Sequence, residues 1–333
     1  MLKITSRVHK ALMFGACLVV ATVAGAGTNC ETVFRLNEAA SYQEGCFPPC
    51  MCPTVEATRF RGTFVVGPAS ICSGVASHDV QRIAWYLTID SAEFEIVGSG
   101  LYRVIAGTNP PTHALDLDLS IDGGNPQHFF SGFVPKTSND SSIDIPISIN
   151  GQTCQDTVIV VNASPVPPES MLQYRLAPDS TYQTGCFGAC ECPLQEPRPL
   201  EGTLTLVKIL DHGTYEEFAV PRADFVTKPL GPTDDGINLS GFGLYTLIQG
   251  FAGPAHVLDL RLSSNGGEIE LFDNQLFNTD PTFPAEFSVV IDTDDQICFD
   301  KVLSLHAIWA GPIVFQDDFE CGDSAGWSFL TEP

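Results

Sequence analysis

The chain has 333 residues, with 40 acidic and 16 basic side chains and a formal net charge of −24. A surface of this charge repels phosphate backbones and anionic lipid headgroups, so nucleic-acid binding is not expected. The length predicts about two domains, each large enough to bury its own core. The acidity is typical of a protein kept soluble outside the cell, an interpretation that we favour over cation binding.

Residues 1–26 have the three-part order of a secretory signal peptide. A basic head precedes an apolar run over 11–23, and an Ala-x-Ala cleavage site follows at 24–26. The run is shorter than the ~20 residues of a membrane helix, and no later run reaches that length. We therefore expect no transmembrane segment, a mature chain that begins near Gly27, and a secreted, cell-surface or periplasmic location.

One segment of twelve residues occurs twice. Residues 42–53 read YQEGCFPPCMCP and residues 182–193 read YQTGCFGACECP, with eight identical positions at an offset of 140. Further landmarks recur in the same order, including a Gly-x-Gly-Leu-Tyr segment and a His-x-Leu-Asp-Leu segment. A period this long indicates a duplicated domain, because solenoid repeats span only about 20–50 residues.

The duplication sets the predicted domain boundaries. We expect a first β domain over 27–162 and a second over 170–312, which repeats the first. The proline-rich residues 163–169 are predicted to form a semi-rigid linker. An acidic C-terminal tail over 313–333 departs from the repeat.

The pattern within each copy predicts an all-β fold. Short β-branched and aromatic runs, such as residues 83–89 and 114–121, alternate with Gly, Asn and Asp turn signals. Asn150-Gly151 separates two such runs, and both residues tolerate the positive φ of a tight hairpin. We expect two tandem antiparallel β-sandwich domains. A barrel-like arrangement is the alternative, since hairpins and alternation fit both.

The cysteine-rich segments resemble those of uncharacterised exported bacterial proteins. The end of the chain also resembles a short tail found in many secreted bacterial proteins, which reads D-D-F-E-S-G-D, three residues, then W-S. Residues 317–328 read DDFECGDSAGWS, so Cys321 stands where that pattern has serine. The resemblance implies an exported bacterial protein and carries no known chemistry.

Each copy has four cysteines at corresponding positions: Cys46, Cys50, Cys52 and Cys154, then Cys186, Cys190, Cys192 and Cys298. Disulfides are favoured over zinc, because an exported chain meets an oxidising compartment and the C-x-x-x-C-x-C spacing is not the usual zinc knuckle. Two cysteines one residue apart would need a very tight ring, so one clustered cysteine is expected to pair with the distant fourth. The sequence does not say which one.

The remaining cysteines have no counterpart in the other copy. They are Cys17, which is lost when the signal peptide is cleaved, and Cys30, Cys72 and Cys321. The mature chain therefore has an odd number of cysteines. At least one thiol is expected to be free or to form an intermolecular disulfide.

The copies share few polar residues: Arg35 and Arg175, Tyr42 and Tyr182, Gln43 and Gln183, His113 and His256, Asp116 and Asp259, and Asp156 and Asp300. Alternation along a strand places His113 on the same face as Leu115, with Asp116 on the opposite face. We therefore expect a core histidine in each copy and no metal site. Each of the other shared residues has a structural interpretation as well.

Three acidic clusters raise the question of calcium: Asp116, Asp118 and Asp122; Asp234 and Asp235; and Asp292, Asp294 and Asp295. The loop 292–296 comes closest to a calcium loop, but it lacks the glycine and the distal glutamate of an EF-hand. The sequence thus predicts no cofactor, with calcium at this loop as the alternative.

The chain contains no nucleophile elbow, metalloprotease helix, phosphate loop or dinucleotide fingerprint. We therefore favour a secreted, non-catalytic binding or structural protein whose ligand, a glycan or a protein, the sequence does not identify. The alternative is a secreted hydrolase that acts on polysaccharide through paired carboxylates. The separation of such a pair, about 5–10 Å, is set by the fold and leaves no local motif.

Overall fold

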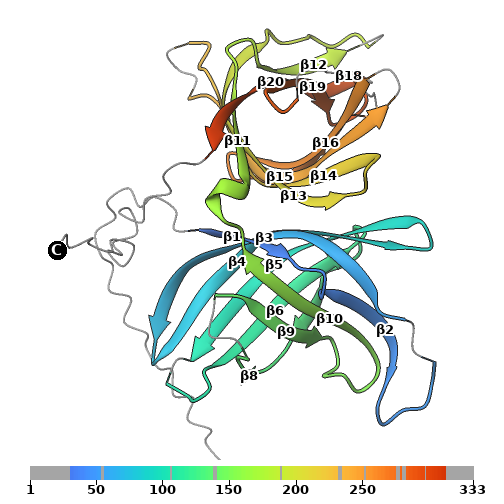
Figure 1. Cartoon of the computed structure of the whole chain (residues 1–333). Coiled ribbons are helices and arrows are strands. Elements are labelled where there is room, and N and C mark those ends of the chain that lie inside the picture. Colours follow the sequence, from blue (N-terminus) through green and yellow to red (C-terminus); the bar gives the residue numbers. More distant parts are fainter. Residues whose placement is uncertain are drawn as a thin grey trace, which may run out of the picture.

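The computed structural model describes residues 31–53, 56–105, 107–137, 141–187, 190–231, 235–250, 253–274, 278–279, 283–296 and 298–312. The expectations for the signal peptide, Cys17, Cys30, Asp234, Cys321 and the tail fall outside these residues. The described chain forms two antiparallel sheets of ten strands each and one short 3-10 helix. The predicted all-β fold with two tandem units is confirmed (Figure 1).

The first sheet contains β1 (Thr32–Leu36), β2 (Ser41–Phe47), β3 (Thr58–Cys72), β4 (Val75–Ile89), β5 (Ala92–Ile105), β6 (Thr112–Ile121), β7 (Gln127–Phe130), β8 (Val134–Pro135), β9 (Ile143–Ser148) and β10 (Cys154–Pro165). Strands β1 and β2 together occupy one position between β10 and β3. At the other end of the strand order, β7 pairs with β9, and β9 pairs with β10. The sheet therefore closes on itself.

The second sheet follows the 3-10 helix η1 (Pro168–Ser170) and repeats this order. It contains β11 (Met171–Leu176), β12 (Thr181–Phe187), β13 (Arg198–Asp211), β14 (Tyr215–Thr227), β15 (Asn238–Gly250), β16 (Gly253–Ser264), β17 (Ile269–Phe272), β18 (Asn278–Thr279), β19 (Glu286–Asp292) and β20 (Cys298–Pro312). Its last gap is closed by one bridge, in which Asp273 and Asp292 exchange backbone hydrogen bonds of 3.0 and 2.9 Å.

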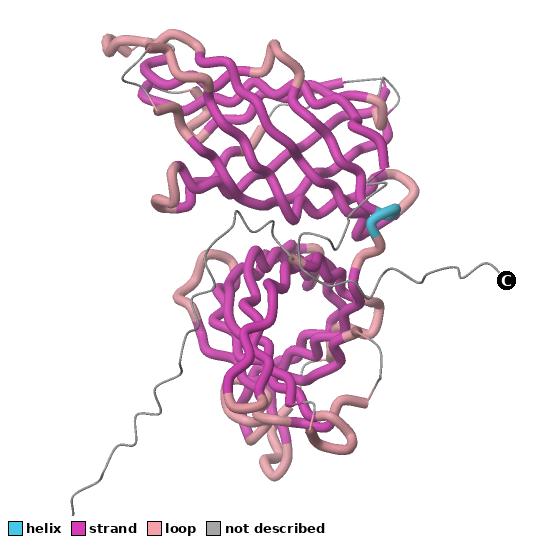
Figure 2. The backbone as a smooth tube through the Cα atoms, turned by 90° about the vertical axis from the view of Figure 1, so that its left-hand side faces the viewer, coloured by secondary structure: helices cyan, strands magenta, loops and turns pink. Residues whose placement is uncertain are grey.

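Each closed sheet is a barrel filled by its own side chains. Trp85, Phe129 and Ile147 are fully buried in the first core, as are Phe272 and Phe287 in the second. Opposite walls therefore pack face to face across the core, as the layers of a sandwich do, while hydrogen bonds join them at the sides. Of the two expected arrangements, the pairing is that of the barrel. Figure 1 looks into the upper barrel and Figure 2 into the lower one, so the two are turned relative to each other.

The repeated Gly-x-Gly-Leu-Tyr segment is explained by the close approach of two strands. A Cβ on Gly98 or Gly100 would lie 2.1 or 2.0 Å from a backbone carbonyl oxygen of β6. Gly241 and Gly243 stand in the same relation to β16, at 1.8 and 1.9 Å. Any side chain there would force the strands apart, so glycine is required for the barrel wall.

Two disulfides fasten one end of each barrel. Cys46 bonds to Cys52 and Cys50 to Cys154 in the first, while Cys186 bonds to Cys192 and Cys190 to Cys298 in the second. The long-range bridges join the clustered segment to the first residue of β10 and of β20. Cys72, at the end of β3, is disulfide-bonded as well.

The connection between the barrels is shorter than the linker predicted over 163–169. Strand β10 continues to Pro165, and its residues Ala163 to Pro165 pair with β1 in the first barrel. Ala163 is fully buried there, because the alternation of β10 carries it into the core. Next, Val166 packs with Met171 and Val207 of the second barrel, so the connection itself is held against both units.

Candidate functional site

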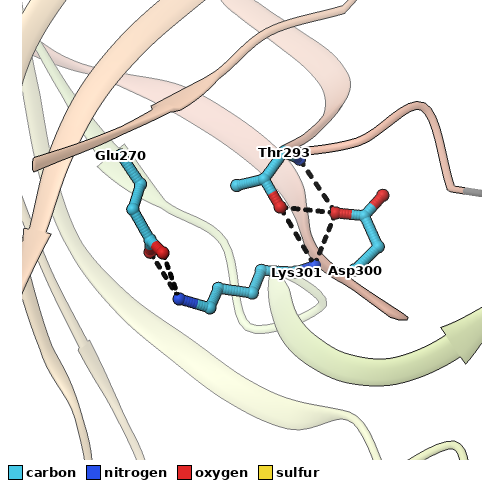
Figure 3. A network of polar contacts seen from close by, with 4 residues as sticks. All are labelled: Glu270, Thr293, Asp300 and Lys301. Carbon is cyan, nitrogen blue, oxygen red and sulfur yellow. Dashed lines mark hydrogen bonds and ion pairs between the residues drawn. The ribbon is translucent and has the colours of Figure 1, made fainter. Parts of the chain in front are cut away.

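Asp156 and Asp300, which the copies share, hold the hairpin that precedes the last strand. The Asp300 carboxylate accepts hydrogen bonds from the Thr293 hydroxyl and from three backbone N–H groups, including that of Lys301, at 2.6–3.0 Å. Figure 3 shows the contacts of Asp300 with Thr293 and Lys301 and the adjoining ion pair of Lys301 with Glu270. The Asp156 carboxylate accepts hydrogen bonds of 2.6–3.1 Å from four backbone N–H groups of its own hairpin. Both residues are structural.

The shared histidines lie in the cores, as strand alternation predicts. His113 is 1% exposed, and its Nδ1 lies 3.2 Å from the Tyr102 hydroxyl oxygen. His256 and Tyr245 repeat this contact in the second barrel. Burial lowers the pKa of His113, which favours its neutral form. These side chains face the barrel interior and not a surface site.

The other shared polar residues also have structural positions. Tyr42 and Tyr182 are buried beside the cysteine-rich segments, and burial raises the pKa of Tyr182 to about 12. Gln183 donates through Nε2 to the carbonyl oxygen of Gln195 at 2.8 Å, which holds the loop after Cys192. Arg35 donates to the Lys208 carbonyl oxygen at 3.2 Å. The duplicated residues therefore maintain the barrels, and a functional site must be sought where the copies differ.

Besides the packing around Val166, the two barrels meet through a small apolar contact between their strands. Ala84 and Tyr86 of β4 pack with Phe242 and Leu244 of β15, and all four are at most 9% exposed. These are residues on the outer faces of both sheets, which alternation would otherwise leave in water. The contact explains why apolar side chains occupy them.

Ion pairs between the barrels flank this contact. Arg61 on β3 donates to Glu217 on β14, with one Nη2–Oε1 distance of 2.8 Å. Arg261 on β16 donates to Glu95 on β5, with an Nε–Oε1 distance of 3.1 Å. Each barrel thus supplies one arginine and one glutamate, and these charge-assisted bonds fix the orientation of one unit on the other.

A third bridge uses equivalent arginines from both copies. Arg82 and Arg222 lie at the irregular positions of β4 and β14, and both bind Glu31, at 3.4 and 2.5 Å. This pair of arginines is not among the predicted residues, although their offset of 140 residues matches the duplication. The offset alone could have identified them, but not their common partner.

Asp116 and Asp259 occupy equivalent positions but have different surroundings. Asp116 forms an ion pair with Arg103 on the outside of the first barrel. Asp259 is half-buried at the junction of the barrels, where burial, and then the charges of Asp273 and Glu95, raise its pKa to about 6. The aspartate therefore has a basic partner in the first copy and acidic neighbours in the second.

A groove of about 830 Å³ opens beside the junction. The first barrel lines it with the outer face of β4, β5 and β6, including Asp79, Leu101 and Asp118. The second barrel contributes Arg261 and the apolar Phe242 and Ile269. Leu101 and Ile269 are 40% and 58% exposed. The groove thus offers water-accessible apolar, acidic and basic groups along one surface, and we identify it as the candidate site.

The acidic clusters are not brought together as a metal site in the described part of the chain, where no group of three or more candidate ligands has suitable geometry. The Asp292 side chain accepts a hydrogen bond from Gln296 Nε2 at 3.1 Å. A calcium ion at this loop stays a prediction.

We find no helical segment among the described residues with the length and hydropathy that a membrane span requires.

Comparison of the chain with protein-family models, with curated proteins and with solved structures finds no match.

Proposed function

We propose that the protein is a secreted, non-catalytic binding protein that takes an extracellular ligand in the groove between the barrels. The observation that carries this proposal is that both barrels line one groove of about 830 Å³, a size typical of ligand sites. Three ion-pair bridges and four disulfides support it, because a preformed site loses little entropy on binding.

The composition of the groove favours a glycan as the ligand over a folded protein. Asp79, Asp118, Arg82 and Arg261 supply hydrogen-bond donors and acceptors, and Leu101 supplies an exposed apolar surface. A sugar chain presents hydroxyl groups and C–H faces side by side, and it fits a concave site of this kind. A folded protein partner would need a flatter area of about 800 Å² per side.

The proposal is tested with a glycan array on the oxidised mature protein, with groove variants beside the natural sequence. Leu101→Arg and Ile269→Arg place a bulky cation in the groove, and we expect each to reduce binding by about tenfold or more. Val290→Arg is the control, because Val290 is 39% exposed on β19 and lies outside the groove lining. Equal binding by all four proteins would refute the groove as the site.

The alternative function is a secreted hydrolase, and one observation favours it. Asp79 on β4 and Asp118 on β6 both line the groove, with only β5 between their strands. Paired carboxylates of this kind can act as acid and base on a glycosidic bond. If a hydrolysis screen finds turnover, Asp79→Asn and Asp118→Asn should each abolish it, while Val290→Arg should leave it unchanged. Binding without turnover in the natural protein supports the non-catalytic function.

A further inference from the structure

The second barrel has a pocket of its own, at a place distinct from the groove. A cavity of about 690 Å³ lies at one end of this barrel, between β14, β15 and the segment that precedes β19. Phe218, Leu247 and Phe283 form its apolar wall, and Lys208, Glu216 and Gln249 lie at its polar edge. The volume falls within the range of small-molecule sites, and barrel ends are a common place for them.

The apolar wall is rigid, because it belongs to the core of the barrel. Phe218 and Leu247 are 4% and 3% exposed. The Phe283 ring packs edge-on against Phe218, with centroids 5.7 Å apart, and stacks on Tyr245 at 5.5 Å. Tyr245 is in turn held by His256. Such an aromatic wall is preformed, so an apolar ligand can pack against it without rearrangement of the core.

The charges at the edge of the pocket select against anions. Lys208 is the one cation among the described residues that line it, and its Nζ lies 2.7 Å from both Asp211 and Glu216. The positive charge is therefore already neutralised. Glu169 lies exposed on the same edge. A carboxylate or sulfate group brought here would meet acidic side chains and no available cation.

The first barrel differs at the matching positions. His78 stands where the second barrel has Phe218, since each faces the repeated tyrosine of the next strand. The His78 ring is held by the Gly67 carbonyl oxygen, 3.0 Å from Nδ1. Val104 stands where the second barrel has Leu247. The aromatic wall is therefore a property that the second copy has and the first does not share.

We propose that this end of the second barrel binds a small apolar molecule that is uncharged or cationic. The site is separate from the groove, so one can fail its test without the other. Its occupant is a ligand with an aliphatic or aromatic body that lies in the pocket against the wall of Phe218, Leu247 and Phe283. Any polar group of the ligand faces Gln249 and Glu216 at the edge.

The test uses the full mature protein and the fluorescent probe N-phenyl-1-naphthylamine. We expect one probe per chain in the natural protein. In Gln249→Trp and Ser170→Trp, which each place a bulky ring at an exposed position of the pocket lining, probe affinity should fall at least about tenfold. Both positions are exposed, so the fold should tolerate the change. Thr88→Trp on the first barrel is the control and should bind as the natural protein does. Probe uptake that is absent, or equal in all four proteins, overturns the proposal.

Competition identifies the charge class of the ligand. Octanol and octyltrimethylammonium should displace the probe at concentrations about tenfold lower than octanoate does. Glu216→Gln releases Lys208 from one carboxylate and should improve displacement by octanoate. If octanoate competes as well as octanol in the natural protein, the selection against anions is wrong. If Glu216→Gln leaves octanoate unchanged, Lys208 does not control the charge preference.

Discussion

At the scale of single residues, equivalent side chains of the two copies contribute differently to the stability of the fold. Asp116 and Asp259 occupy equivalent positions, yet only Asp259 lies at the junction of the barrels, where its pKa is raised to about 6. An aspartate whose folded-state pKa is raised favours the protonated form. Its contribution to stability is therefore most favourable below about pH 4 and declines as the pH rises to about 6.

We expect Asp259→Asn to stabilise the protein at pH 7.5, because the amide removes a charge that burial disfavours. A shift of about two pKa units corresponds to roughly 1–3 kcal/mol in the free energy of unfolding. The gain should disappear near pH 4, where the natural aspartate is itself neutral. Urea unfolding at the two pH values measures it.

Asp116→Asn is the matched control for this experiment. It removes the ion pair with Arg103 and offers no relief from burial, so it should not stabilise the protein at pH 7.5. A destabilising effect of Asp259→Asn at pH 7.5 would show that the carboxylate is favourably paired and that its pKa is not raised.

At the scale of strands, the sequence predicts much of each barrel but not its closure. Alternation in residues 114–121 predicts which side of β6 is buried, since Leu115 and Leu117 lie in the core and Asp118 does not. The cysteine quartets indicate that the cluster is fastened to β10 and β20. Closure depends on pairing between residues far apart, such as Phe34 with Pro165, and no local pattern encodes it. The local sequence pattern therefore fits a sandwich and a barrel equally well.

The candidate groove could not be predicted for a related reason. Leu101 and Ile269 lie 168 residues apart and on different barrels, so only their placement in space makes them neighbours of one groove. Each side chain alone reads as an exposed apolar residue on a strand, which is common at protein surfaces. The repeat offset of 140 residues identifies Arg82 and Arg222 as equivalent positions, but only the docking of the barrels determines that both bind Glu31.

The long-range disulfides should stabilise each barrel separately. Cys190 and Cys298 lie 108 residues apart, and the loss of a native disulfide typically costs about 2–5 kcal/mol. We expect the double variant Cys190→Ser and Cys298→Ser, which leaves no stranded thiol, to lower the unfolding midpoint of the second barrel only. Calorimetry resolves the two transitions.

The first barrel provides the reciprocal control. The double variant Cys50→Ser and Cys154→Ser should lower the first transition and spare the second. If either double variant lowers the midpoints of both transitions equally, the barrels unfold as one unit. The long-range disulfides then do not stabilise each barrel separately.

At the scale of the whole molecule, the groove exists only while the barrels stay docked. The apolar contact is small, so the orientation depends heavily on the flanking ion pairs. The Arg61 and Glu217 side chains are 16% and 5% exposed, and breaking such a buried pair from one side typically costs about 3–5 kcal/mol. Reversing one charge should therefore loosen the docking, and reversing both should restore it.

We expect Arg61→Glu to place three carboxylates together, because Glu93 also contacts Arg61 at 2.5 Å, and to increase the radius of gyration measured by X-ray scattering. Adding Glu217→Arg should bring back the compact profile and any glycan binding lost with it. Lys228→Glu is the control. Its pair with Glu201 is more than half exposed on both sides, and such surface pairs contribute only about 0–1 kcal/mol. An unchanged scattering profile in Arg61→Glu would show that the other contacts between the barrels, which include Arg261 with Glu95, hold them without this ion pair. In that case the groove would not depend on this ion pair.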